Sequence, residues 1–219
     1  MRIEAGRIGR YALFASALLA FPATAPRAQA LYDAFVEAVV ADRSDEVRAL
    51  LARGIDPNTV DPNGEPVLLV AARAGWQPTV SALLAGGAKV DAKNPFGDRP
   101  IMVAALGGHL AIVKMLLRRG AALDTPGWTP LSYAATNGQT EVAQYLLDVG
   151  ASVNAVAPNG TTALMMAVRG GHGATVDLLL ARGADVNQRN QDGATALGWA
   201  TRGEFKAIEQ ALRARGARS

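Results

Sequence analysis

The chain has 219 residues, of which 50% are apolar, 5% aromatic and 19% charged, and it contains no cysteine. A formal charge of +3 and an isoelectric point near 9.5 would ordinarily point to a nucleic acid or an anionic membrane as partner. Four of the 22 basic residues and one of the 19 acidic residues precede position 31, so residues 31–219 carry 18 of each sign. Composition therefore argues against a strongly basic nucleic-acid-binding domain, and the lack of cysteine excludes a disulfide framework.

The first thirty residues have the three-part pattern of a secretory signal peptide. Three arginines stand among the first ten residues, residues 11–21 are apolar or small, and Ala28 and Ala30 frame a small-x-small cleavage site. A retained membrane anchor is the alternative, but this apolar segment would form a helix of only ~16 Å, about half of a bilayer core. The excess of arginine over lysine and the high alanine content suggest a bacterial source. We therefore predict a signal peptide over residues 1–30, a periplasmic or secreted location, and no membrane attachment after cleavage.

A repeat organises the rest of the chain. Six glycines recur at intervals of 33 residues, with one interval of 30: Gly54, Gly87, Gly120, Gly150, Gly183 and Gly216. A pair of leucines ends three residues before each of the first five, and Gly216 lacks this pair. The leucines would bury one face of a helix, and the glycine suits the left-handed position that ends it. The pattern predicts six structural units.

A second phrase precedes each leucine pair in phase, best seen from Gly127 to Leu131, Gly160 to Leu164 and Gly193 to Leu197. Its threonine can cap the helix that follows, and Pro130 stands where a helix loses nothing by lacking an N–H group. Alanines recur in this first helix, where a neighbouring unit must come close. Each unit is therefore predicted to be a turn, a helix, a short turn and a second helix, joined to the next unit by a hairpin-like stretch rich in Asn, Asp, Pro and Gly.

These phrases resemble the ankyrin repeat, most closely over Gly127 to Ala135, Gly97 to His109 and Leu179 to Asn187. The resemblance covers about residues 31–219 and implies an all-α solenoid of helix-turn-helix units with short β-hairpin tips. We expect one domain made of two polar capping units and four inner repeats, with the boundaries 31–60, 61–93, 94–123, 124–156, 157–189 and 190–219. Polar caps are needed because an inner unit buries apolar surface on both sides.

Residues that could carry chemistry do not cluster in the sequence. The two histidines, His109 and His172, share one repeat position, at which other units have Trp76, Gln139 and Phe205. Such variation argues against a shared metal or catalytic role. Neither a phosphate-binding loop nor a nucleophile motif is present, and the basic pairs at helix ends lack the interleaved aromatic residues typical of single-stranded nucleic-acid binding. We therefore predict a protein that is not an enzyme, with no cofactor, no metal and no nucleic-acid partner.

The repeat also indicates where a partner would bind. Hairpin tips and the ends of the first helices should face outward, which makes these residues candidates for partner binding: Phe96, Trp128, Arg73, Leu106, Asn137, Arg169, Asp98 and Glu65. Exposed aromatic residues often anchor an interface, although Phe96 and Trp128 could instead cover a neighbouring repeat. Tyr133 and Trp199 occupy a first-helix position that predicts core or groove lining. The hairpin before the fourth unit is three residues short, which should leave a notch beside Trp128.

The resemblance implies protein–protein recognition on the concave face of the solenoid. The leading hypothesis is a monomeric adaptor that acts in the bacterial periplasm. Two alternatives remain open from the sequence: an immunity or inhibitor protein that blocks a secreted toxic enzyme, and an accessory protein that supports a catalase in peroxide defence. The identity of the partner is not encoded in the repeat itself.

Overall fold

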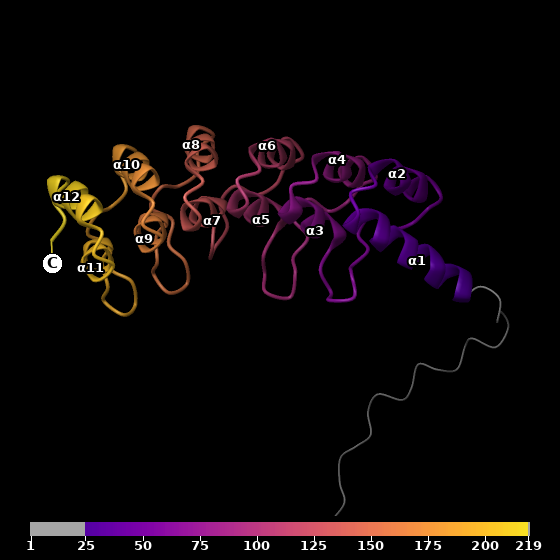
Figure 1. Ribbon diagram of the computed structural model, residues 1–219, viewed down its shortest axis with the longest axis horizontal. Helices are drawn as coiled ribbons and strands as arrows, with labels where there is room; N and C mark the ends of the chain where they lie inside the picture. The colour runs from indigo at the N-terminus through magenta and orange to yellow at the C-terminus, as the bar shows by residue number, and fades with distance from the viewer. Residues whose placement is uncertain (1–24, 219) are drawn as a thin grey trace, which may run out of the picture.

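The computed structural model describes residues 25–218. Within these residues the chain forms six successive helix pairs (Figure 1). The first three pairs are α1 (Ala25–Val40) with α2 (Ser44–Ala52), α3 (Val67–Ala74) with α4 (Gln77–Ala85), and α5 (Pro100–Leu106) with α6 (Leu110–Arg118). The last three are α7 (Pro130–Thr136) with α8 (Thr140–Asp148), α9 (Ala163–Arg169) with α10 (Gly173–Ala181), and α11 (Ala196–Arg202) with α12 (Lys206–Ala214).

The helices form two rows, in which odd-numbered helices pack on odd-numbered neighbours and even-numbered helices on even-numbered ones (Figure 1). The connections between pairs project on the side of the odd-numbered row, and we call α3, α5, α7, α9 and α11 the inner helices. Four of these connections have 14 residues, whereas residues 119–129 before α7 number only 11. The shortened hairpin predicted for this position is therefore present.

Side chains cap the later inner helices as the repeated threonine predicts. Thr129, Thr162 and Thr195 each accept a hydrogen bond from the backbone N–H three residues later, at 3.1–3.3 Å. Thr129 also makes the reciprocal bond of a capping box, because its own N–H donates to Ser132 Oγ at 3.0 Å. One of the four N–H groups left unpaired at the start of each of these helices is thus satisfied by a side chain.

The predicted β-hairpin tips contain almost no β-structure. The described residues show two isolated antiparallel bridges, Val60 with Pro66 and Val156 with Thr162. Polar side chains shape the tips instead: the Oδ1 atoms of Asp61, Asn94 and Asn190 each accept hydrogen bonds from the N–H groups two and four residues later. These bonds satisfy backbone groups that a strand ladder would otherwise pair.

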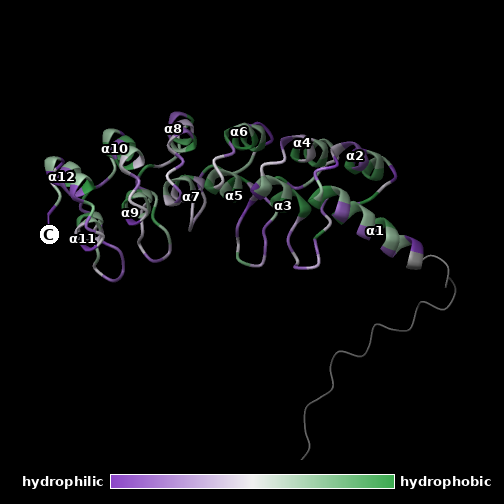
Figure 2. Cartoon of the chain, viewed as in Figure 1, coloured by the Kyte–Doolittle hydropathy of each residue, from purple (hydrophilic) through white to green (hydrophobic). Residues whose placement is uncertain are grey.

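One apolar core runs through all six pairs (Figure 2). The predicted close approach of the inner helices is confirmed, since Ala71, Ala104, Ala134 and Ala167 are fully buried at their contacts. At the start of the stack, Phe35 of α1 is fully buried as well. Because apolar surface of each repeat is buried against the adjacent repeats, the stability of a repeat depends on its neighbours.

Hydrogen bonds at one repeat position also join neighbouring repeats. His109 Nε2 donates to the Arg73 carbonyl oxygen at 3.1 Å and His172 Nε2 to that of Thr136 at 3.0 Å. Gln139 does the same to Leu106 O at 3.3 Å. Each side chain therefore caps the C-terminal end of the preceding inner helix, which is the structural role expected for the histidines.

Candidate functional site

Three cavities lie along the inner helices in succession, and neighbouring cavities share lining residues. The first, of about 450 Å³, lies between the hairpin of residues 86–99 and the shortened connection, and its wall includes Phe96, Trp128 and Tyr133. Trp128 and Tyr133 also line the second cavity, of about 250 Å³. Arg169 lines both the second and the third, which measures about 490 Å³. We call this row of three cavities the inner groove.

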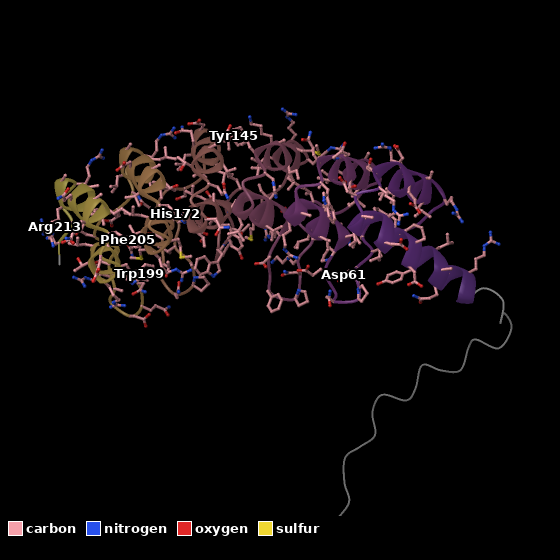
Figure 3. The ribbon with its side chains drawn as sticks, viewed as in Figure 1. Asp61, Tyr145, His172, Trp199, Phe205 and Arg213 are labelled. Atoms are coloured by element: carbon pink, nitrogen blue, oxygen red, sulfur yellow. The ribbon has the colours of Figure 1, made fainter. Side chains whose placement is uncertain are left out.

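Aromatic side chains from α7 and α11 form part of its walls. Tyr133 and Trp199 occupy the same repeat position as Val103 and Met166, which are buried. The two larger residues are only half-buried, pack against the core with one side and line the groove with the other. Figure 3 shows Trp199 on α11 in the inner row, with Phe205 nearby. The structure therefore confirms core or groove lining for both positions.

The two predicted aromatic anchors differ in their surroundings. Phe96 is 87% exposed at the tip of its hairpin and lines the first cavity. Trp128 is half-buried and packs against the hydrophobic core. The expectation of a freely exposed ring therefore holds for Phe96, whereas Trp128 is a wall of the groove that also covers neighbouring apolar surface. Trp128 stands near the end of the shortened connection, residues 119–129, just before α7 begins at Pro130.

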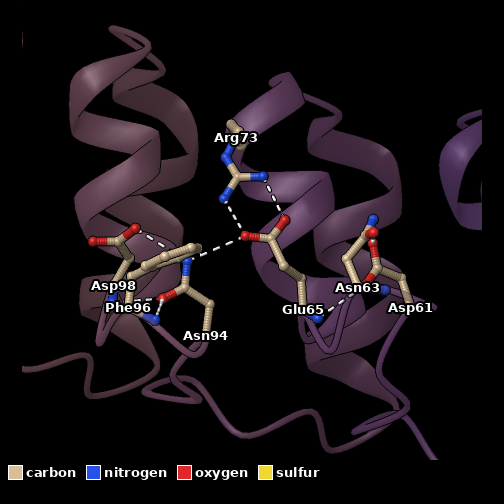
Figure 4. A network of polar contacts seen from close by, with 7 residues as sticks. All are labelled: Asp61, Asn63, Glu65, Arg73, Asn94, Phe96 and Asp98. Atoms are coloured by element: carbon tan, nitrogen blue, oxygen red, sulfur yellow. Dashed lines mark hydrogen bonds and ion pairs between the residues drawn. The ribbon is translucent and has the colours of Figure 1, made fainter.

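Glu65 and Arg73 contact each other rather than facing solvent separately (Figure 4). Two hydrogen bonds of 2.5 and 2.6 Å join the guanidinium of Arg73 to the carboxylate of Glu65, whose side chain is only 15% exposed. The hydrogen bond from Arg73 holds the pKa of Glu65 below its ordinary value, and the same bond raises the pKa of Arg73. The outward orientation expected for Glu65 is wrong, because this neighbouring cation draws the carboxylate inward.

Asp98 is likewise engaged. It accepts hydrogen bonds from Asn94 Nδ2 at 3.0 Å and from the hydroxyl of Tyr133 in the next repeat. Asn94 Nδ2 also donates to Glu65 Oε1 at 3.1 Å (Figure 4). Burial, followed by the bond to Asp98, raises the pKa of Tyr133 above its ordinary value. Asn94 links the two carboxylates but was not among the candidates, although its recurrence as Asp61 and Asn190 at the same repeat position could have indicated it.

The remaining candidates lie at the ends of the inner helices. Leu106 lines the second cavity, and its carbonyl oxygen accepts a hydrogen bond from Asn137 Nδ2 at 3.2 Å. Arg169 is exposed where the second and third cavities meet. Arg202, at the equivalent position one repeat further on, is not among the residues predicted from the sequence, yet it lines the third cavity. The groove thus collects Phe96, Trp128, Asp98, Leu106 and Arg169, whereas Glu65, Arg73 and Asn137 do not line these three cavities.

Over residues 25–218, no group of three or more His, Cys, Asp or Glu side chains is placed to hold a metal ion. None of the helices in this part of the chain has the length and apolar character needed to cross a bilayer. Ala28 and Ala30, the predicted cleavage positions, are exposed in the first turns of α1, and the rest of the signal pattern, up to residue 24, lies outside the described residues.

Comparison with known proteins agrees with the geometry. The family described as "Ankyrin repeats (3 copies)" matches residues 35–125, 78–157 and 152–218, which together cover most of the chain. No curated protein matches the chain significantly. The family match and the stack of twelve helices in the described residues confirm the all-α repeat solenoid expected from the sequence. The chain belongs to the ankyrin-repeat family.

Proposed function

We propose that this protein binds another protein through the inner groove and catalyses no reaction. Ankyrin repeats generally mediate protein–protein interaction, and solenoids of this kind use their extended inner surface for it. The observation that supports this site is continuity: three cavities connected through Trp128, Tyr133 and Arg169 provide one groove with half-buried aromatic walls. Rigid aromatic side chains with one free face are typical interface anchors.

Partner capture with matched variants tests this proposal. The tagged chain is incubated with periplasmic extract of its host, and bound proteins are identified by mass spectrometry. The double variant Phe96→Ala/Trp199→Ala should lose the captured protein, because both rings line the groove. The control Val149→Ala removes an exposed apolar side chain beyond the C-terminal end of α8, outside the groove, and should retain it. If the double variant is folded, as judged by circular dichroism, and still captures the partner, the groove is not the binding site.

The proposed site of action is the bacterial periplasm, to which residues 1–30 direct export and where the chain acts as a monomer once they have been removed. Leu31 packs against the core, whereas the side chains of residues 27–30 of α1 are exposed. Cleavage after Ala30 would therefore leave the core contacts in place. N-terminal sequencing of the chain from the periplasmic fraction should begin at Leu31, and light scattering should give the mass of one copy. A full-length chain found only in the cytosol would contradict this proposal.

A further inference from the structure

Glu65 and Ala194 occupy equivalent positions in two repeats with the same backbone geometry. The N–H of each donates to the Oδ1 atom four residues earlier, Asp61 or Asn190, at 2.8 Å. The carbonyl oxygen of each accepts from the N–H of that same residue, at 2.8 and 3.0 Å. A side chain at position 194 therefore starts from the same place, relative to its repeat, as the Glu65 carboxylate does.

The arginines that face these positions are also equivalent. Arg73, Arg169 and Arg202 each lie in the last turn of an inner helix, eight residues after Glu65, Thr161 and Ala194. Arg73 is paired with Glu65. Within residues 25–218, Arg169 and Arg202 form no ion pair, because threonine and alanine replace the carboxylate. The last two repeats thus keep the cation and lack the internal anion.

The third cavity occupies the side of the molecule on which this missing carboxylate would stand. Ala194, Arg169 and Arg202 all line it, together with Trp199 and Phe205. Asp192, at the hairpin tip, is the one acidic residue in its wall. The lining therefore has a net positive charge, although residues 31–219 as a whole carry equal numbers of basic and acidic groups. Positive charge beside apolar walls favours an anionic partner group that also brings apolar surface.

We propose that the partner supplies the missing carboxylates: the C-terminal half of the inner groove binds an acidic protein segment, with an aspartate or glutamate at Arg202 and another at Arg169. Each guanidinium donates two parallel hydrogen bonds to its carboxylate, as Arg73 does to Glu65. An apolar side chain between the two acidic residues packs against Trp199. This inference rests on the proposed function and names the chemistry of the partner.

A protein segment suits this site better than a polyanion does. Trp128, Tyr133, Met166 and Trp199 supply apolar surface along the second and third cavities, which the apolar side chains of a protein segment would cover. The charges are few and fixed at one repeat spacing, whereas nucleic-acid binding relies on many cations along a backbone.

Selection from a random dodecapeptide library displayed on phage, with the purified full chain as bait, tests the proposal. Enriched peptides should carry at least two acidic residues around an aromatic or aliphatic one. Fluorescence polarisation of the most enriched peptide should show binding at least tenfold weaker than to the wild type for Arg202→Gln and for Ala194→Glu. In Ala194→Glu the new carboxylate should pair with Arg202 and so compete with the peptide. In the control Ala194→Gln the new side chain has the size of glutamate without its charge, so peptide binding should weaken no more than threefold relative to the wild type. Ala194→Glu should also melt at a higher temperature than Ala194→Gln.

Several outcomes would overturn the acidic-segment assignment. These are enrichment of peptides without acidic residues, no enrichment at all, equal binding and melting for the two Ala194 variants, or arginine-dependent binding of single-stranded oligonucleotides or phosphatidylglycerol vesicles in place of peptides. Failure of this inference is separable from failure of the proposed function. If Phe96→Ala/Trp199→Ala loses the captured protein and Ala194→Glu keeps it, protein binding stands and the acidic segment does not.

Discussion

Tyr133 and Asp98 join two neighbouring repeats at the first cavity of the inner groove: the hydroxyl of Tyr133 donates a hydrogen bond to Asp98 Oδ1, 35 residues earlier in the chain. Asp98 also contacts Asn94, and Asn94 contacts Glu65, which is paired with Arg73. A chain of polar contacts therefore crosses three repeats. Because it holds both the hairpin of Asp98 and the ring of Tyr133, it fixes the position of two walls of the groove.

Replacing Tyr133 by phenylalanine tests the energetic weight of this contact. The variant keeps the ring and removes the donor, so Asp98 loses a charge-assisted hydrogen bond. We expect the free energy of unfolding to fall by about 1–2 kcal/mol, measured by urea denaturation at pH 7. The control is Tyr145→Phe, because Tyr145 lies in the outer row, contacts Lys114 through its ring, and forms no hydroxyl hydrogen bond within the described residues. An equal loss in both variants would show that the Asp98 contact contributes nothing specific.

The same contact predicts how stability depends on alkaline pH. The folded protein raises the pKa of Tyr133 above its ordinary value of 10.0, so the neutral hydroxyl is favoured in the folded state. This contribution is complete below pH 10 and is lost as the pH rises above the unfolded value toward the folded one. Urea denaturation between pH 9 and 11 should therefore show a steeper loss of stability for the wild type than for Tyr133→Phe. Parallel curves would contradict the shift.

The Glu65–Arg73 pair should stabilise the fold at neutral pH and lose this effect in acid. The pKa of Glu65 is lowered from 4.5 by its hydrogen bonds to Arg73, so its contribution is present above that value and is lost as the pH falls through the lower, folded value. We expect Glu65→Gln to reduce the free energy of unfolding by about 1–2 kcal/mol at pH 7, discounted because Arg73 is partly exposed. The difference from the wild type should shrink below pH 4.

An exposed ion pair of the same chain provides the control for this experiment. Asp45 is 95% exposed in its contact with Arg48 on α2. Asp45→Asn should change the free energy of unfolding by less than about 0.5 kcal/mol at pH 7. If Glu65→Gln behaves like Asp45→Asn, the enclosed position of Glu65 adds nothing to the pair.

The regular part of the fold could be predicted from the sequence because it repeats. A glycine that follows a helix, and the threonine that begins α7, α9 and α11, carry the same backbone requirement each time they recur, so each repetition strengthens the prediction. Gly54 and Gly150, with φ of 90° and 100°, occupy the predicted left-handed conformation. The binding site lacks this advantage because it is built from the positions that differ. That Glu65 turns toward Arg73 depends on the orientation of side chains eight residues apart, which spacing alone did not reveal.

His172 tests the contacts between repeats. Its Nε2 atom caps the end of α7 through Thr136 O, and Gln139 makes the equivalent bond one repeat earlier. We therefore expect His172→Gln to change the free energy of unfolding by less than about 0.5 kcal/mol, because an amide N–H replaces the ring donor. His172→Ala should cost about 1–3 kcal/mol, since it leaves the carbonyl oxygen without this donor and opens space beside Gly138 and Gly170. Equal effects of the two substitutions would mean that the hydrogen bond is unimportant.

The sequence indicated both Phe96 and Trp128 as candidate anchors, and the structure separates them. Phe96→Ala should alter the free energy of unfolding by less than about 0.5 kcal/mol, because the ring is 87% exposed. Trp128→Ala should lower the free energy of unfolding by about 2 kcal/mol, less than the 3–5 kcal/mol of a fully buried aromatic, because one side of the indole faces the groove.

Urea denaturation measures the stability of the two variants, and partner binding is then compared at a temperature where both are folded. Loss of binding in Phe96→Ala with unchanged stability would assign the ring to the interface, whereas unchanged binding would leave the hairpin tip outside it.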